Sequence, residues 1–404
     1  MQTEVQQELT RPATFAPRQR IVPRRLRVLH LVSHLGVGGT EHGVLKIIKG
    51  LGDQEFEHHI CAVRAIDAEF AAHAGRYATV STVGTAKPGF QFPLFRLVRL
   101  MKQVRPDVVH SRNFGAIEAV PAARLARVPV VVHSEHGYEL EILGGLPIRR
   151  RVVCAAFYAL ADQVVTVSTE LRSYYSRQAW RSSDNVRVIY NGVDTEAFAP
   201  RPAATLSTRA GLGIPASRTV IGSVGRLVSI KDYRSLLQAA EKLLQEGRDL
   251  QIVLVGSGPE YSNLRNQAEA SPLLANRTTF VGASNRIPEL VNAMDVFVLP
   301  SISEGMSNTV LEAMATGLPV VVSAAGGNPE LVEDGRTGFL FAPRDVQALA
   351  GHVSRLVADA GFRRRLGDAA RQRAVDTFSL SNMVRNYRNL YLDLASRRRA
   401  QEEN

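Results

Sequence analysis

The segment DVFVLPSISEGMSNTVLEAMATGLPVVVS, residues 295–323, carries the most chemistry in the chain. An apolar strand is predicted to end at Leu299, a polar loop follows with Glu304, and a helix begins near Thr309 with Glu312 in its first turn. Both carboxylates are therefore predicted to face one crevice, where they would accept hydrogen bonds from sugar hydroxyls while the backbone N–H groups between them meet phosphate. Thr309-x-x-Glu312 also fits a capping box, an alternative that leaves Glu304 unexplained.

Two cations stand at another predicted strand end, in SVGRLVSIKD. Arg226 and Lys231 are five positions apart in the loop before a predicted helix. Because arginine offers a fork of donors and lysine a point charge, the pair suits a diphosphate. The alternative is a pair of solvated loop charges, and these two residues alone do not decide between the readings.

A glycine-rich turn follows the first predicted strand, in HLGVGGTEHG. Gly36, Gly38 and Gly39 precede a helix that begins near Thr40, so backbone N–H groups and the helix N-terminus can approach a phosphate. The pattern G-x-G-x-x-G fails because Glu41 occupies the third position, which argues against an NAD-binding oxidoreductase. An ordinary tight turn between strand and helix is the alternative.

A second glycine turn occurs in AAGGNPELVEDG. Gly326 and Gly327 precede Asn328 and Pro329, which are predicted to be the N-cap and the first residue of a helix. Glu330 then lies in the first turn, where a carboxylate stabilises the helix dipole. A Gly-Gly turn at a strand edge also brings backbone close to a ligand.

Histidines end a predicted strand in VPVVVHSEHGYE. His133 and His136 are followed by Gly137, and a histidine at the edge of a cleft can donate to a hydroxyl or to a developing charge. A structural role is the alternative for each. Neither the two cysteines, Cys61 and Cys154, nor any Asp-x-Asp pair at a strand end has metal-ligand spacing, so no metal and no cofactor are predicted.

The elements that position these residues alternate along the chain. Short β-branched runs alternate with helical patterns from about Leu26, break after Asn191-Gly192 into FAPRPAATLSTRAGLGIP, and resume at TVIGSVGRL. The break is predicted to be a linker, and each alternation a doubly wound parallel sheet. The 404 residues therefore predict an α/β fold of two tandem Rossmann-like domains with a ligand cleft between them.

The net charge of +11 is unevenly distributed. The excess is +7 over residues 1–200, −1 over 201–350 and +5 over 351–404. Basic ends suit an anionic surface such as phospholipid or nucleic acid, and a solvated arginine-rich surface is the alternative. No signal peptide or transmembrane run is evident, and the cysteine usage indicates a reducing cytosol.

From about Arg25 to Arg399 the chain resembles the family-four-type glycosyltransferases of the two-Rossmann GT-B kind. The resemblance rests on SEGMSNTVLEAMATGLPVV, GRLVSIKD, EHG at 135–137, YNGVD at 190–194 and GGNPELV at 326–332. HSRNFGAIEA, SEHGYE, YNGVDTEAF and GNPELVEDGRTG are similar to a bacterial sugar-transferase subgroup associated with exopolysaccharide and exosortase gene clusters.

The resemblance implies a retaining, metal-independent transfer of a sugar from a nucleotide diphosphate sugar to an acceptor hydroxyl. Arg226 and Lys231 match the diphosphate clamp, Glu304 the carboxylate that holds the donor sugar, Glu312 the one that binds ribose, and His136 the histidine near the reacting face. The other positions implied to bind the donor are Gly38, Gly39, Gly305, Asn308, Thr309 and Gly327.

The resemblance also implies domain roles. It implies an acceptor domain over residues 25–195, a donor domain over 196–376, and a helix over 377–404 that crosses back to the first domain. Residues 1–24, which precede the resemblance, are predicted to be a flexible basic arm. The implied partners are a lipid-linked glycan acceptor and, through ILGGLPIRRRVVCAAFYAL, an anionic membrane at the inner cytoplasmic face.

Three other functions compete with this reading. The first is a nucleotide-sugar hydrolase or epimerase of the same fold, which would form product without an acceptor. The second is a non-catalytic sugar-nucleotide-binding protein, against which the intact pair of cations and pair of carboxylates argue. Nucleic-acid binding is not expected, because basic motifs with interleaved aromatic residues are absent from the sequence.

Overall fold

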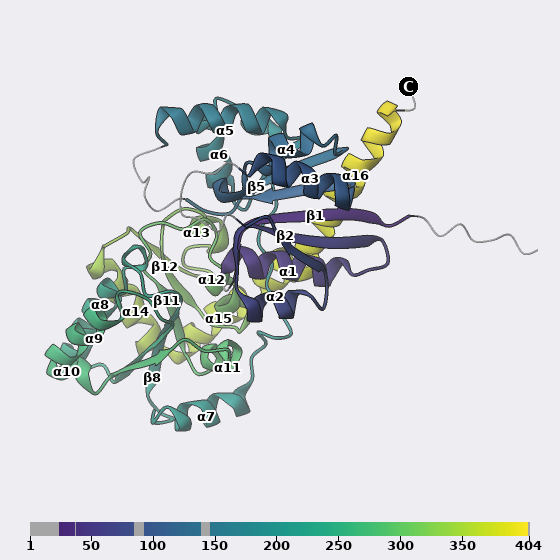
Figure 1. The fold of residues 1–404 in the computed structure, drawn as a ribbon. Helices are drawn as coiled ribbons and strands as arrows, with labels where there is room; N and C mark the ends of the chain where they lie inside the picture. The colour runs from purple at the N-terminus through teal and green to yellow at the C-terminus, as the bar shows by residue number, and fades with distance from the viewer. Residues whose placement is uncertain (1–23, 37, 85–92, 139–145, 403–404) are drawn as a thin grey trace, which may run out of the picture.

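The computed structural model describes residues 24–36, 38–84, 93–138 and 146–402. Two parallel sheets with helices on both faces form two Rossmann-like domains, as predicted (Figure 1). The predicted N-terminal arm lies outside the described residues except for residue 24. Within the described ranges, no helix combines the length and the apolar character that crossing a membrane requires.

The first domain is built on a seven-stranded sheet in the order β3-β2-β1-β4-β5-β6-β7. Its strands are β1 (Leu26–Leu35), β2 (Phe56–Ile66), β3 (Thr79–Thr82), β4 (Val108–Arg112), β5 (Val130–Glu135), β6 (Gln163–Thr166) and β7 (Val186–Val188). Its helices are α1 (Gly39–Leu51), α2 (Ala68–Ala74), α3 (Leu94–Val104), α4 (Ala119–Leu125), α5 (Ile148–Leu160) and α6 (Thr169–Gln178).

The second domain is built on a six-stranded sheet in the order β10-β9-β8-β11-β12-β13. Its strands are β8 (Thr219–Val224), β9 (Leu250–Val255), β10 (Thr278–Gly282), β11 (Val296–Leu299), β12 (Val320–Ser323) and β13 (Gly338–Phe341). Its helices are α7 (Pro202–Gly211), α8 (Tyr233–Gln245), α9 (Tyr261–Ala270), α10 (Pro272–Ala275), α11 (Ile287–Asn292), α12 (Asn308–Ala315), α13 (Asn328–Leu331), α14 (Val346–Ala358) and α15 (Ala360–Phe378).

The inner strands are the apolar runs seen in the sequence. Every residue of β4, β9, β11 and β12 is buried, because helices cover both faces of a parallel sheet. The edge strands β3 and β13 have only four residues each, and neither is among the strands predicted from the sequence.

The predicted linker is wrong in part, because residues 202–211 form α7. Pro202 occupies the first turn, where its fixed φ suits a helix, and alanines follow. The buried Arg209 donates to the carbonyl of Ala293 at 2.9 Å and pairs with Asp295 at 2.7 Å. This tertiary contact anchors the helix, whereas the local sequence shows only prolines and small polar residues.

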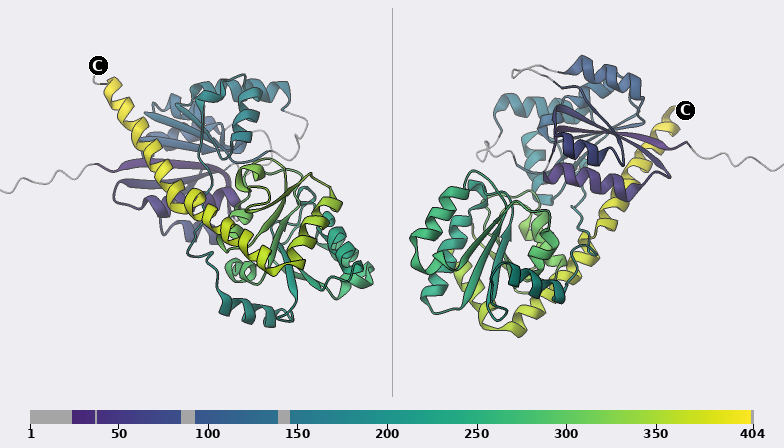
Figure 2. Two further views of the ribbon diagram at one scale, coloured as in Figure 1. Left: turned by 180° about the vertical axis from the view of Figure 1, so that it is seen from behind. Right: turned by 60° about the horizontal axis from the view of Figure 1, so that its bottom comes forward.

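The chain passes between the domains twice, and the two passages pair. Val193 N–H donates to the carbonyl of Phe378 at 2.9 Å, and Leu380 N–H donates to that of Val193 at 2.8 Å. After this point α16 (Leu380–Glu402) runs back along the first domain and packs against α1 (Figure 2). Its Tyr391 hydroxyl reaches Nδ1 of His110 in β4 at 2.7 Å.

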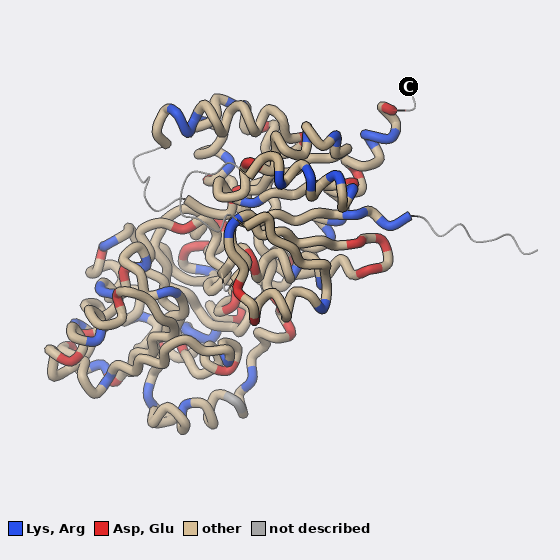
Figure 3. The backbone as a smooth tube through the Cα atoms, viewed as in Figure 1, with Lys and Arg blue, Asp and Glu red and all other residues tan. Residues whose placement is uncertain are grey.

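Basic residues are spread over the first domain, and two places on it carry three arginines in a row. Figure 3 shows them at the start of α5 and towards the end of α16. These are the arginines 149–151 and 397–399. Ile148 and Val152 of α5 are also 62% and 53% exposed, so charge and exposed apolar surface occur on the same helix.

Candidate active site

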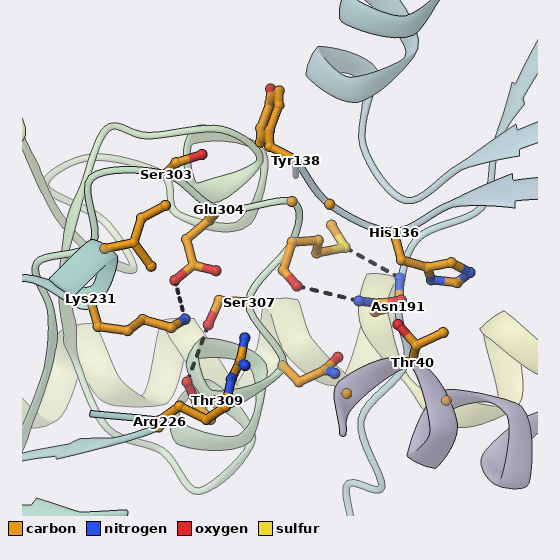
Figure 4. A pocket seen from close by; sticks show the side chains of 18 of the residues that line it. Thr40, His136, Tyr138, Asn191, Arg226, Lys231, Ser303, Glu304, Ser307 and Thr309 are labelled. Atoms are coloured by element: carbon orange, nitrogen blue, oxygen red, sulfur yellow. Dashed lines mark hydrogen bonds and ion pairs between the residues drawn. The ribbon is translucent and has the colours of Figure 1, made fainter. Parts of the chain in front are cut away.

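A cavity of about 320 Å³ lies between the domains. It is lined from the first domain by the start of α1, the end of β5 and the segment at 191–192, and from the second by the loops after β8 and β11. Eight of the predicted site residues line it: Gly39, His136, Arg226, Lys231, Glu304, Gly305, Asn308 and Thr309 (Figure 4). The other three, Gly38, Glu312 and Gly327, lie outside this lining.

Lys231 and Glu304 form an ion pair inside the cavity. Lys231 Nζ lies 2.5 Å from Glu304 Oε1, and the side chains are 18% and 10% exposed. The hydroxyl of Ser301 donates to the same oxygen at 2.6 Å, and Ile302 N–H donates to the carbonyl of Ile230 at 2.8 Å. Because β8 and β11 are neighbours in the sheet, their loops meet and hold the pair in one position.

Arg226 is the cation left free. Its exposed guanidinium forms no ion pair and no side-chain hydrogen bond with the described residues. Figure 4 shows it beside Thr309, at the start of α12. The Lys231–Glu304 pair is close to neutral, so the uncompensated positive potential in the cavity comes from Arg226, Lys46 and the N-terminal amides of α12.

The helix α12 begins differently from the prediction. Its N-cap is Ser307, whose hydroxyl accepts from Val310 N–H at 3.4 Å, so the Thr309-x-x-Glu312 capping box is wrong. Glu312 lies beyond the first turn and is half-buried. Burial raises its pKa to about 7, and Lys46 of α1 opposes the rise. This carboxyl group therefore caps no helix amide, and it is partly protonated at pH values near 7.

Glycines let backbone segments stack closely at the cleft, both between the domains and within the second domain. A Cβ on Gly305 would overlap the carbonyl of His136, and one on Gly327 would overlap the carbonyl of Gly305. Gly326 has φ +55, and a Cβ there would overlap the carbonyl of Glu304. Only residues without a side chain permit this stacking of backbone on backbone at the cleft.

The start of α13 also corrects the sequence prediction. The N-cap is Gly327, and Asn328 is the first helical residue instead of the predicted cap. Its buried side-chain amide donates to the carbonyl of Ser323 at 3.0 Å. Asn328 thus ties the turn to the end of β12 and leaves the helix N-terminus to glycine.

His136 lies across the cavity from Lys231 and Glu304, beside Asn191 and Thr40 (Figure 4). Burial, reinforced by the charge of Arg112, lowers the pKa of His136 to about 3, so its ring is neutral at physiological pH. Its Nε2 is buried and has no hydrogen-bond partner among the residues that the structure describes.

His133 is structural. Its Nδ1 lies 2.8 Å from the Ser111 hydroxyl and its Nε2 lies 3.1 Å from Glu135 Oε1, all within the core. The histidine pair of the sequence therefore divides into one residue of the core and one that lines the cavity.

Sequence reasoning assigned no role to several residues that shape the cavity. Asn113, at φ +57, accepts from His136 N–H at 2.9 Å and donates to the Thr40 hydroxyl at 3.3 Å. Asn191 donates to the carbonyl of Met306 at 3.3 Å, across the two domains. Both lie in segments that carried the resemblance, HSRNFGAIEA and YNGVD, but the residues that they contact are distant in sequence.

Lys46 lines the cavity from α1. Its spacing in the sequence gave no sign of this, because it stands among the apolar residues that pack α1 on the sheet. Over residues 24–36, 38–84, 93–138 and 146–402, no group of three or more His, Cys, Asp or Glu side chains is arranged to hold a metal ion.

Two family profiles match the chain. Glycosyltransferase Family 4 matches residues 37–197, and Glycosyl transferases group 1 matches residues 206–373. The UDP-Gal:alpha-D-GlcNAc-diphosphoundecaprenol alpha-1,3-galactosyltransferase of Escherichia coli is 31% identical over 307 residues, which cover 74% of this chain and 79% of that protein. The alpha-maltose-1-phosphate synthase of Mycolicibacterium smegmatis is 34% identical and covers 70% and 78%.

Solved structures agree on the architecture. HepE from Anabaena, in complex with UDP, superposes with a TM-score of 0.79 at 23% identity, covering 92% of this chain and 100% of its own. A glycosyltransferase from Rickettsia africae gives a TM-score of 0.80 at 21% identity, covering 92% and 98%. With both halves matched and the two-sheet fold shared, the chain belongs to the family-four-type GT-B glycosyltransferases, enzymes of class EC 2.4.

Proposed function

We propose that this glycosyltransferase moves a sugar from a nucleotide diphosphate sugar to an acceptor hydroxyl, with retention of anomeric configuration and without a metal ion. The observation that carries the proposal is the grouping of free Arg226, the Lys231–Glu304 pair and the start of α12 in one cavity. A diphosphate fits this set, because it needs cations and amide donors placed in advance. HepE, solved with UDP and with UDP-glucose, supports a UDP-sugar donor.

In this reaction the bond between the anomeric carbon and the diphosphate oxygen breaks, and negative charge grows on the leaving group. Arg226, Lys231 and the α12 amides stabilise that charge. Glu304 accepts hydrogen bonds from the sugar hydroxyls and keeps Lys231 oriented. The acceptor oxygen attacks on the face that the diphosphate leaves, and its proton passes to the departing phosphate oxygen, so no protein nucleophile is required.

The remaining residues complete the donor site. In this proposal the neutral His136 lies near the donor sugar, and Glu312 binds the ribose. Gly38, Gly39, Gly305, Asn308, Thr309 and Gly327 bring backbone and short side chains to the diphosphate and sugar. In this proposal residues 25–195 form the acceptor domain, 196–376 the donor domain, and 377–404 the helix that crosses back.

The acceptor that we propose is a lipid-linked glycan of exopolysaccharide or cell-surface polysaccharide synthesis. The E. coli relative is named for transfer to a diphosphoundecaprenol-linked sugar, which supports this class. Exposed Ile148, Val152 and Trp180 beside the basic start of α5 suit contact with anionic lipid at the inner face of the cytoplasmic membrane. Flotation of the protein with vesicles that does not depend on anionic lipid would contradict this part.

The test is a thermal-shift and turnover screen with UDP-, GDP- and ADP-sugars, with and without EDTA. We expect stabilisation by one donor, acceptor-dependent release of the nucleotide, and equal rates in EDTA, with the product configuration assigned by proton NMR. Release without acceptor would indicate the hydrolase or epimerase alternative. Stabilisation without any turnover would indicate the non-catalytic alternative, and loss of activity in EDTA would contradict metal independence.

A further inference from the structure

The N-terminus of α6, in the first domain, is capped by a side chain of the second domain. Within the first domain, Ser168 is the N-cap and accepts from Leu171 N–H at 3.1 Å. The first two helical amides, those of Thr169 and Glu170, instead donate to the two carboxylate oxygens of Glu330, at 2.9 and 3.0 Å. A helix leaves its first amides without partners in the helix, so this carboxylate fills a need that residue 168 alone does not meet.

The turn that carries Glu330 is fixed by contacts within the second domain. Arg373 of α15 donates to the carbonyls of Glu330 and Leu331, each at 2.8 Å, and pairs with Glu333. The carboxylate therefore projects from a fixed turn, and its position follows that of the second domain. Figure 1 shows α13, which carries Glu330, at the boundary between the two domains.

The same turn carries the glycines that approach the cavity. Gly326 and Gly327 stack on the backbone of Glu304 and Gly305, and a Cβ on Gly327 would lie 3.0 Å from Cβ of Ser168. The contact between Glu330 and α6 thus sets how close the loop of Glu304 comes to the first domain. The other end of the interface is the backbone pairing of Val193 with Phe378 and Leu380, which can act as a pivot.

We propose that Glu330 is a positioning residue, an interdomain cap that holds the domains closed over the donor cleft. The cap consists of its carboxylate and the amides of Thr169 and Glu170. Its loss would leave the open arrangement more populated, so the donor would bind less tightly while the chemistry in the closed form stays the same. This inference rests on the proposed function only for the part that concerns the donor.

The direct test measures the distance between the domains in the full chain without ligand. Leu125 and Leu273 are exposed on different domains and are changed to cysteine for nitroxide labels, whereas Cys61 and Cys154 are buried. Double electron–electron resonance spectroscopy then compares the label-to-label distance in the labelled parent with that in Glu330→Ala, Glu330→Gln and the control Glu333→Gln. Glu333 belongs to the same segment, but its carboxylate accepts from Arg336 and Arg373 of its own domain. The side-chain oxygen of a glutamine at 333 still accepts from Arg373, so the support of the Glu330 turn is kept.

We expect Glu330→Ala to shift the distances upward and broaden them, Glu330→Gln to do so less because its amide oxygen still accepts one bond, and Glu333→Gln to match the parent. In turnover, Glu330→Ala should raise KM for the donor about tenfold with kcat changed less than about threefold. If Glu330→Ala folds poorly, the distances measured in Glu330→Gln decide whether the interdomain cap exists.

Unchanged distances in both Glu330 variants, or an equal shift in Glu333→Gln, would overturn the interdomain cap. Because the distances are measured without a substrate, they decide the cap even if the parent protein transfers no sugar. Absence of transfer by the parent would instead contradict the proposed function.

Discussion

The two domains contribute different kinds of groups to the cavity. The second supplies charged side chains on short loops, namely Arg226, Lys231 and Glu304. The first supplies backbone and neutral groups, and Lys46 is the one charged side chain that it places in the described lining. Most of the charge in the cavity thus belongs to the second domain, and the first domain faces it with mainly neutral groups.

The first domain also has a charged side chain near the cleft, but that side chain is buried in the domain core. The guanidinium of Arg112 is almost fully buried, with its Nη2 3.3 Å from Nδ1 of His30 and 3.2 Å from Nδ1 of His110. Burial and this guanidinium hold the pKa of both histidines well below the usual range, so the rings are neutral. This network supports the strand ends behind His136 and adds no exposed charge to the cavity.

The strongest test of the contrast is Glu304→Gln. Removing this charge should lower kcat by about 10²–10³-fold, because a preorganised polar group at the reacting centre is lost and Lys231 loses its partner. Thermal unfolding should change little, since the glutamine oxygen still accepts from Lys231 Nζ and from the Ser301 hydroxyl. The matched control is Glu269→Gln on the surface of α9, and a Glu304→Gln enzyme with parental turnover would contradict the assignment.

A smaller effect is expected in the first domain from Asn113→Ala. The change removes the acceptor for His136 N–H and the donor to Thr40, and it places alanine at a positive φ. We expect a loss of about 1–2 kcal/mol in the free energy of unfolding and about tenfold in kcat/KM. Asn113→Asp keeps the acceptor and should lose less on both measures. Equal losses in the two variants would show that the hydrogen bond is not responsible.

Glu312 gives a test by pH, because it is a carboxyl of the second domain without a preformed ion pair. Its folded pKa of about 7 exceeds the ordinary value of 4.5, so the folded state holds a proton that the unfolded state releases. The contribution of Glu312 to stability should therefore fall as pH rises from about 4.5 to 7 and then level off, by at most about 3 kcal/mol. In urea denaturation from pH 4.5 to 8, the stability of the parent relative to Glu312→Gln should show this fall, because the buried neutral histidines affect both proteins equally. Parallel curves for the two proteins would refute it.

The smallest effect is expected where the two domains meet at the interdomain cap. Burial raises the pKa of Glu170, Arg177 opposes the rise, and repulsion by the nearby carboxylate of Glu330 adds a smaller increase. Glu170→Gln should stabilise the fold by about 0.5 kcal/mol in urea denaturation at neutral pH. Glu69→Gln, also in the first turn of a helix but exposed, should instead be neutral or slightly destabilising. The same sign for both variants would contradict the repulsion.

The sequence alone identified most of the sheet strands and the loops at their ends. Strand alternation is a local signal, and the segments around Arg226, Lys231 and Glu304 each follow directly on a strong apolar run. Because parallel strands end at one edge of a sheet, adjacency of these loops could be expected before the structure was known. This explains why the second domain's part of the cavity was predicted more completely than the first domain's part.

Other features were decided by tertiary contacts. The predicted linker contains the helix α7, which the pairing of Arg209 with Asp295 anchors to the second domain. The N-cap of α12 is Ser307, whereas the sequence spacing predicted Thr309. Glu330 lies 161 residues from Thr169, whose amide it caps. Local patterns determine which segments form strands and helices, since those depend on near neighbours. Packing determines which polar groups pair when they lie about 80 to 160 residues apart in the sequence, because only the folded chain brings such groups together.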